Sequence, residues 1–146
     1  MKVKVFGAAG EVTGSAYYVD TEQGGILVDF GMFQGGKMAE ARNRLSSTLI
    51  VGAIKAVLLT HAHLDHVGRL PFLARTSFAG KIYATEATID LTRLILTDAA
   101  KIQRYDAERW NRKRRKQGLE PVEPIFNDDD VEKIMSLMHP VQYDLP

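Results

Sequence analysis

The sequence predicts an α/β domain built around a mixed sheet. Short apolar segments bounded by glycine-rich turns come first in the chain, and they predict consecutive strands. After residue 54, apolar runs alternate with segments of helical periodicity, which is the pattern of strands joined through helices. With 45% hydrophobic and 25% charged residues, the 146-residue chain can bury the core of one domain.

Three strands are predicted before residue 30. In chain order they are residues 2–6, 15–20 and 26–28, separated by a glycine-rich loop at 7–14 and a hairpin turn at 23–25. The third strand ends at Asp29. The glycine-rich loop leads into a strand and lacks the spacing of a nucleotide-binding loop, so it is interpreted either as a tight turn or as a substrate contact.

Helices and strands alternate in the middle of the chain. The predicted elements are a short helix at 37–45, a buried strand at 54–59, a polar loop at 60–66, a helix at 68–75 and a strand at 81–84. Pro71 is compatible with the first turn of its helix, where a missing N–H costs nothing.

A long helix follows the last of these strands. Thr85 is its expected N-cap, and Gly118 its expected end. Leu91, Leu94 and Ile95 recur at helical spacing and are predicted to face the core. Beyond this helix, residue 127 or 128 is expected to cap a last helix at 130–138, His139 is interpreted as structural, and residues 141–143 are expected to begin a strand.

The end of the long helix is strongly basic. Eight Lys or Arg residues and two acidic residues lie between Lys101 and Lys116, although the net charge of the chain is only +1. Arg112 and Arg115 could contact phosphates, or the cations could be solvated and favoured by the helix dipole. Tyr105 and Trp110 could stack on bases, but their helical position favours packing for at least one of them.

Several classes of protein are excluded or disfavoured. The apolar runs are far shorter than the ~20 residues that cross a bilayer, and the N-terminus does not have the continuous apolar stretch of a signal peptide. The chain has no cysteine, which excludes disulfides and thiolate zinc sites. A cytoplasmic location is therefore expected.

Metal-binding residue types gather directly after the predicted strand 54–59. Three of the four histidines lie between His61 and His66, together with Asp65. Imidazole nitrogens and carboxylate oxygens suit Zn²⁺, and Mn²⁺ is also possible. In an extended loop, residues two apart point the same way, so His61 and His63 could share one metal while Asp65 and His66 face a second. A solvated, histidine-rich loop is the alternative.

This cluster resembles the His-x-His-x-Asp-His motif of the metallo-β-lactamase superfamily. The resemblance implies an αββα sandwich and two zinc ions, with His61 and His63 on one ion and Asp65 and His66 on the other. Asp29 matches the aspartate that this family places at a strand end, where it would hydrogen-bond a ligand histidine and fix its tautomer. Asp65 and Asp29 are the catalytic candidates.

Three further stretches are similar to the RNA-processing β-CASP branch of that family. They are residues 7–15, 29–35 and 66–71. The resemblance implies RNA as the substrate and places Glu11, Thr13 and Gln34 at the rim of the active-site cleft. For Phe33, a place at the rim and a place in the core are equally consistent with the sequence.

The family pattern continues beyond the motifs found in this chain. Residues 1–146 are therefore expected to be the N-terminal portion of a metallo-β-lactamase domain, without the β-CASP domain and the C-terminal part of the fold. With two donors for each ion, this portion should bind zinc weakly and catalyse little by itself. Its unpaired sheet edges could also associate with other copies.

Two other functions stay open at this point. The same fold could hydrolyse DNA or a small thioester or lactam. The chain could instead be a binding module that holds no metal.

Overall fold

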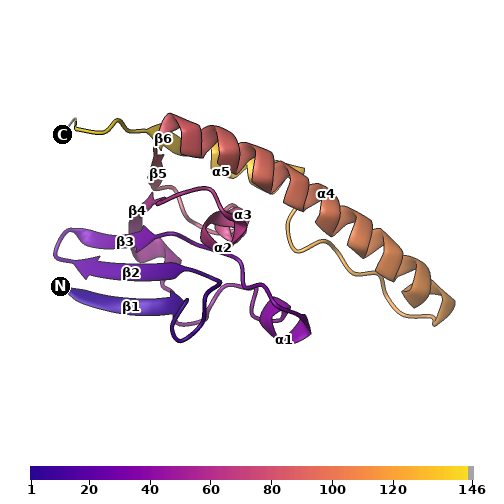
Figure 1. The fold of residues 1–146 in the computed structure, drawn as a ribbon. Helices are drawn as coiled ribbons and strands as arrows, with labels where there is room; N and C mark the ends of the chain where they lie inside the picture. The colour runs from indigo at the N-terminus through magenta and orange to yellow at the C-terminus, as the bar shows by residue number, and fades with distance from the viewer. Residues whose placement is uncertain (145–146) are drawn as a thin grey trace.

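The computed structural model describes residues 1–144, except for the side chain of Glu40. Its strands are β1 (Lys2–Gly7), β2 (Ala16–Thr21), β3 (Gly24–Val28), β4 (Ile54–Leu58), β5 (Lys81–Ala84) and β6 (Met138–Pro140). Its helices are α1 (Lys37–Glu40), α2 (Leu64–Val67), α3 (Leu70–Leu73), α4 (Glu86–Lys116) and α5 (Asp128–Met135), with a 3₁₀ turn at Val51–Ala53. Figure 1 shows their arrangement.

The six strands form one mixed sheet in the order of the sequence. β1, β2 and β3 are antiparallel neighbours, whereas β4, β5 and β6 continue the sheet in parallel with β3. The tight hairpin between β2 and β3 explains the antiparallel half, because antiparallel strands need only a short turn and parallel strands need a crossover. The predicted α/β class with a mixed sheet is confirmed.

The core lies between this sheet and the helices. Leu27, Val57 and Ile82 from the central strands are fully buried, as are Leu70 and Ile134 from the helices. In the view of Figure 1, α2 and α3 lie between the strands and α4. No helix among residues 1–144 is both long enough and apolar enough to cross a membrane.

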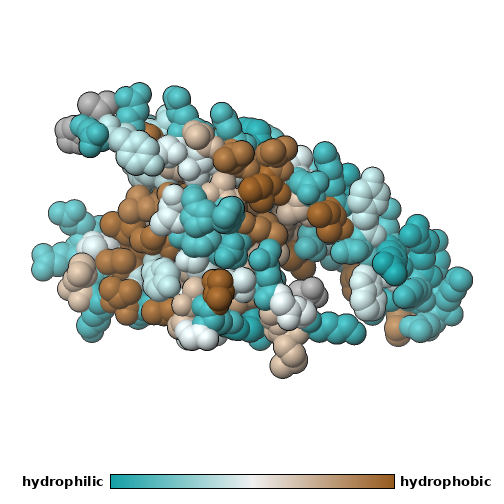
Figure 2. All heavy atoms as spheres, in the orientation of Figure 1, coloured by the Kyte–Doolittle hydropathy of each residue, from teal (hydrophilic) through white to brown (hydrophobic). Residues whose placement is uncertain are grey.

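The helix α4 begins and ends at the predicted residues. The Thr85 hydroxyl accepts a hydrogen bond from the Thr88 amide, which satisfies a free N–H of the first turn, and Gly118 has the positive φ of 68° that suits glycine after a helix. The C-terminal half of α4 extends beyond the sheet and the other helices (Figure 1). The space-filling view shows that its end is hydrophilic (Figure 2).

The predicted core face of α4 was wrong for Leu91 and Leu94 and confirmed for Ile95. Leu91 is 52% and Leu94 is 65% exposed, and only Ile95 packs against the core. The helix buries a neighbouring face that consists mainly of smaller residues: Thr92, Leu96, Ala99, Ala100 and Ala107. Small side chains let the helix approach its neighbours closely, so the larger apolar residues lie beside the contact and not in it.

Five predicted boundaries also differ, and one of them is the helix expected at 68–75, which is limited to α3. The helix expected at 37–45 is limited to α1, and residues 64–67 of the expected polar loop form α2. The last helix is α5, which Asn127 caps as expected, but the helix starts two residues earlier than predicted because Asn127 and Asp130 form a capping box. The strand expected at 141–143 is β6 at Met138–Pro140, which pairs with β5. The earlier end of α5 leaves those residues free to join the sheet edge.

Candidate metal centre

The histidine cluster lies where two adjacent parallel strands end. Asp29 follows β3, and the segment 60–66, called the metal loop below, follows β4. Backbone hydrogen bonds join the metal loop to the loop after β3: the Phe30 amide donates to the His66 carbonyl at 2.8 Å, and the Met32 amide to the Leu64 carbonyl at 3.0 Å. Ligand-binding sites in α/β folds usually lie at the carboxyl ends of adjacent parallel strands.

A glycine makes this close contact possible. A Cβ atom at Gly31 would lie 1.6 Å from the carbonyl oxygen of Asp65, where no side chain can fit. The same Asp65 carbonyl accepts a hydrogen bond from the Ser15 amide at 2.9 Å. The backbone of the metal loop is therefore held both by Ser15, which directly precedes β2, and by the loop after β3.

Asp29 organises the polar side of the cluster. It is 2% exposed and has a φ of 56°, a left-handed conformation that aspartate tolerates better than most residues. Its carboxylate accepts hydrogen bonds from the Thr60 amide at 2.9 Å, the Thr60 hydroxyl at 2.8 Å and the Ser15 hydroxyl at 3.4 Å. It also lies 2.8 Å from Nδ1 of His66.

That contact is the hydrogen bond expected to fix the tautomer of the His66 ring. When Nδ1 carries the proton that Asp29 accepts, Nε2 keeps its lone pair and is available to a metal ion. Nε2 lies 3.7 Å from the Asp65 carboxylate. The hydrogen bond expected of Asp29 is present, and the role of His66 as a ligand stays a prediction.

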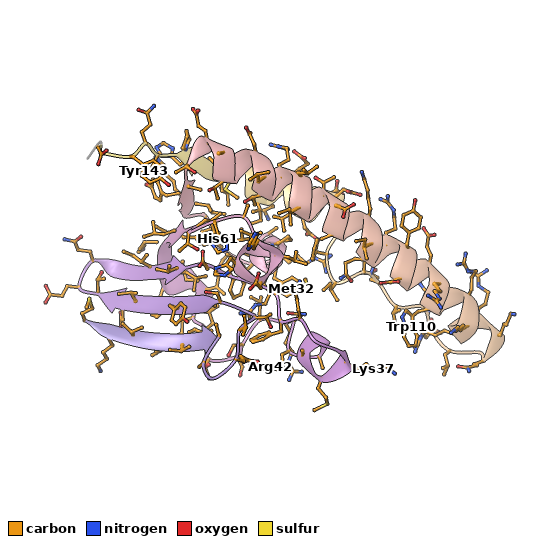
Figure 3. The ribbon with its side chains drawn as sticks, viewed as in Figure 1. Met32, Lys37, Arg42, His61, Trp110 and Tyr143 are labelled. Atoms are coloured by element: carbon orange, nitrogen blue, oxygen red, sulfur yellow. The ribbon has the colours of Figure 1, made fainter. Side chains whose placement is uncertain are left out.

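The three imidazole rings lie close together. The ring centroid of His61 is 3.9 Å from that of His66 and 4.6 Å from that of His63. Figure 3 shows His61 at the strand ends beside α2. Burial and the charges of His66 and His63 lower the pKa of His61, although Asp29 and Asp65 act in the opposite direction. The ring is thereby favoured in its neutral form, which is the form that binds metals.

The residues fit a metal ion by chemistry and by proximity. Three imidazoles and one carboxylate are the donors that zinc and manganese accept. Within residues 1–144, however, no three His, Cys, Asp or Glu side chains are arranged as a group that could hold an ion. The donors are gathered, but a complete coordination set is not formed.

Each of the predicted rim residues forms hydrogen bonds within the protein. Glu11 forms a bidentate pair with Arg42 at 2.7 and 2.8 Å. The Thr13 hydroxyl accepts a hydrogen bond from the Gln34 amide at 3.1 Å and donates to the Gln34 carbonyl at 3.3 Å. These contacts join the glycine-rich loop to the segment that follows β3. A substrate contact by Glu11, Thr13 or Gln34 stays a prediction.

The basic end of α4 lies apart from this rim. Arg112 and Arg115 line a surface hollow together with Arg109, Lys113 and Lys116. Tyr105 is 65% and Trp110 is 57% exposed, so the packing expected for at least one of them was wrong. Trp110 instead lines an open pocket that α4 shares with the returning segment 122–125 and with residues 32–35 after β3, so Trp110 and the predicted rim residue Gln34 line the same pocket.

The residues that hold Asp29 and Phe33 were not predicted from the sequence. Thr60 and Ser15 support Asp29 through their hydroxyls. Phe33 is 3% exposed, with the guanidinium of Arg42 at 3.8 Å and that of Arg69 at 4.6 Å from its ring centroid. The available signal for Thr60 was its place in the sequence: it carries a hydroxyl, follows a predicted strand and directly precedes the candidate ligand His61.

Comparison with known proteins settles the family. The model of the family described as "Metallo-beta-lactamase superfamily" matches residues 9–140. The chain belongs to the metallo-β-lactamase superfamily. The resemblance seen in the sequence is thus confirmed at this level, and the mixed sheet flanked by helices is the matching part of that fold.

Three similar members of the superfamily cover different shares of the chain. Ribonuclease TTHA0252 of Thermus thermophilus is 41% identical over 143 residues, which are 98% of this chain and 28% of that protein. Transcription termination factor FttA of Thermococcus kodakarensis is 31% identical over 147 residues, covering 91% of this chain and 20% of that protein. A solved metallo-β-lactamase of Cronobacter sakazakii with a HARLDQ motif is 22% identical, with a TM-score of 0.45, over 60% of this chain and 30% of that one. The chain thus spans less than a third of each of these proteins.

Proposed function

We propose that this chain supplies part of the active site of a metal-dependent ribonuclease of the β-CASP branch, which cleaves phosphodiester bonds in RNA. The observation that carries the proposal is the Asp29–His66 hydrogen bond inside a cluster of three imidazoles and one carboxylate. An aspartate that fixes the tautomer of a neighbouring histidine is the arrangement that prepares the imidazole for a metal.

Each residue then has a distinct role. His61 and His63 would hold one divalent ion, and Asp65 and His66 a second. Such ions lower the pKa of a bound water and stabilise negative charge at phosphorus. The Asp65 carboxylate, which is 20% exposed, can orient the attacking water and accept its proton. Asp29 keeps the His66 proton on Nδ1 and does not itself contact the substrate.

The proposal includes weak metal binding by the 146-residue chain. Tight zinc sites use three or four protein ligands, whereas this cluster offers two for each ion. Among residues 1–144, no three His, Cys, Asp or Glu side chains are arranged as a group that could hold an ion, and the affinity for metal stays a prediction. Further ligands would come from polypeptide other than residues 1–146.

RNA is proposed as the substrate for two reasons. The names of the two sequence relatives describe a ribonuclease and a transcription termination factor, and both names concern RNA or its synthesis. The five cations at the end of α4 form a surface that suits a phosphate backbone, and Arg112 and Arg115 belong to it.

The test measures cleavage of labelled RNA by the full-length native protein with added Zn²⁺ or Mn²⁺. A His63→Ala variant should cleave RNA more than about tenfold more slowly than wild type, because a metal ligand is removed. His139→Ala is the matched control, since His139 is an exposed histidine on β6 and is not one of the candidate ligands. Undiminished cleavage by His63→Ala would refute the ligand assignment, and parallel assays with DNA and a thioester would expose a different substrate class.

A second candidate is a binding module that needs no metal. The observation in its favour is that no three donors among the described residues form a group able to hold an ion. Metal analysis of the native protein before and after chelation separates the two candidates. Stoichiometric metal that a chelator removes together with activity supports the ribonuclease, whereas RNA binding without metal supports the module.

Two smaller expectations belong to the same proposal. A cytoplasmic location follows from the cysteine-free composition. Self-association would use β1 and β6, the two edge strands of the sheet. Sedimentation at several protein concentrations tests the second expectation.

A further inference from the structure

A second cluster of charged side chains surrounds a pocket away from the metal loop. The pocket has a volume of about 700 Å³ and lies between the end of β1, the glycine-rich loop and residues 42–48. Three arginines and one glutamate are its charged lining residues: Arg42, Arg44, Arg69 and Glu11. The lining also includes the hydroxyl residues Ser46, Ser47 and Thr48. The pocket therefore has a net positive charge at neutral pH and several possible hydrogen-bond donors.

Arg69 is the unusual member of this lining. It is 2% exposed, and no carboxylate of the described residues lies within ion-pair distance of it. Its Nε donates to the Gly31 carbonyl, and its Nη2 donates to the Gly14 carbonyl at 3.2 Å and the Phe6 carbonyl at 3.4 Å. Buried charges are normally paired, so a guanidinium held only by neutral carbonyls retains an uncompensated charge.

The neighbouring arginine strengthens this excess. Burial, together with the charge of Arg42, lowers the pKa of Arg69 to about 10, so the group is still a cation at neutral pH. The charge of Arg42 is matched by Glu11 at 2.7 Å. Among the described side chains, no carboxylate forms an ion pair with Arg69 or with Arg44, which lines the same pocket.

The aromatic packing fixes these groups in place. Phe33 has Arg42 and Arg69 near its ring, and the guanidinium of Arg69 lies 4.5 Å from the Phe30 ring centroid. Guanidinium groups that stack on aromatic rings keep a defined orientation and their in-plane N–H donors. The pocket is thus organised before any ligand arrives. Figure 3 shows Arg42 in the loop region below the sheet, away from His61.

We propose that this pocket binds a phosphate group, with Arg44 and Arg69 supplying positive charge and Ser47 supplying a hydroxyl donor. A tetrahedral oxyanion matches planar guanidinium donors and compensates the buried charge of Arg69. The inference does not depend on the metal loop, because it needs no ion and none of the four candidate ligands. The phosphate could be free inorganic phosphate or a phosphodiester of an RNA strand.

The experiment titrates inorganic phosphate into the ¹⁵N-labelled protein at constant ionic strength and follows amide and arginine Nε–H signals. We expect saturable shifts at Arg44, Arg69 and residues 46–48. Arg44→Ala should weaken binding about tenfold, the effect of losing one charged hydrogen bond, and Arg44→Lys should restore part of it. Arg93→Ala is the matched control, because Arg93 is also an exposed arginine but is paired with Glu132 outside the pocket.

A second arm uses a short RNA without terminal phosphates. Displacement of phosphate from the pocket by this RNA, with weaker RNA binding by Arg44→Ala, identifies a phosphodiester as the ligand. Saturable phosphate binding that the RNA does not disturb identifies free phosphate. The proposal is overturned if the chemical shifts grow without saturation or concentrate at the basic end of α4. It is also overturned if Arg44→Ala, with a circular dichroism spectrum that matches wild type, binds phosphate as tightly as wild type.

Discussion

Replacement of Asp29 by alanine should lower the free energy of unfolding by about 4 kcal/mol. Three hydrogen bonds of 2.8–2.9 Å would be lost, from the amide and hydroxyl of Thr60 and from Nδ1 of His66. Thr60 is exposed, so water can replace the carboxylate in part, and a loss of about 1 kcal/mol for each bond is appropriate. Alanine would also be held at a φ of 56°, which costs about another 1 kcal/mol.

Urea unfolding followed by circular dichroism measures this change. The denaturant dependence should be unaltered, and the melting temperature should fall by roughly 12 °C for a chain of this size. Asp29→Gly separates the two contributions, because glycine tolerates positive φ and should be about 1 kcal/mol more stable than Asp29→Ala. A loss of less than about 1 kcal/mol for Asp29→Ala, or a lower stability of Asp29→Gly than of Asp29→Ala, would contradict this prediction.

Three further predictions concern single contacts. The hydrogen bond from Arg42 lowers the pKa of Glu11. The pair therefore stabilises the fold above the unfolded-state pKa of Glu11, and this stabilisation is lost as the pH falls through the folded-state pKa. The difference in melting temperature between wild type and Glu11→Gln should shrink between about pH 5 and pH 3, and a constant difference would contradict this prediction. Gly31→Ala should lower the free energy of unfolding, measured with urea, by about 3 kcal/mol or more, because the new Cβ would overlap the metal loop. Gly52→Ala serves as the control, because a Cβ at Gly52 would meet no atom within 4 Å. Urea unfolding should show that Leu96→Ala, at a fully buried position, lowers the free energy of unfolding by about 3 kcal/mol, whereas Leu94→Ala, at an exposed position, lowers it by less than about 0.5 kcal/mol. Equal losses would show that the exposed face of α4 is covered in solution.

The sequence predicted those elements whose signals are local. The N-cap Thr85 and the positive-φ Gly118 delimit α4 as expected, because capping and turn chemistry act within a few residues. Residues 81–84 form β5 as predicted, since a short apolar run between turns has few alternatives. The strand expected at 141–143 failed, because its position depends on where α5 ends and on pairing with β5.

Tertiary contacts explain the remaining differences between the prediction and the structure. The four candidate ligands are adjacent in sequence, so their proximity could be predicted, and Asp29 was found through its place at a strand end. The exposure of Leu91 and Leu94 could not be predicted from helical spacing, which gives the period of a face but not which face meets the core. Arg69 was missed because its carbonyl partners are distant in sequence.

The backbone hydrogen bonds of the metal loop determine how the loop can respond to a ligand. The amides of Ser15, Phe30 and Met32 donate to three consecutive carbonyls of residues 64–66, so hinge motion of the main chain would break several bonds at once. Adjustment to a bound species must therefore come from rotation of imidazole and carboxylate groups on a stationary frame. Little main-chain entropy remains to be lost on binding, and these three amides should be among the slowest in the chain to exchange with deuterium.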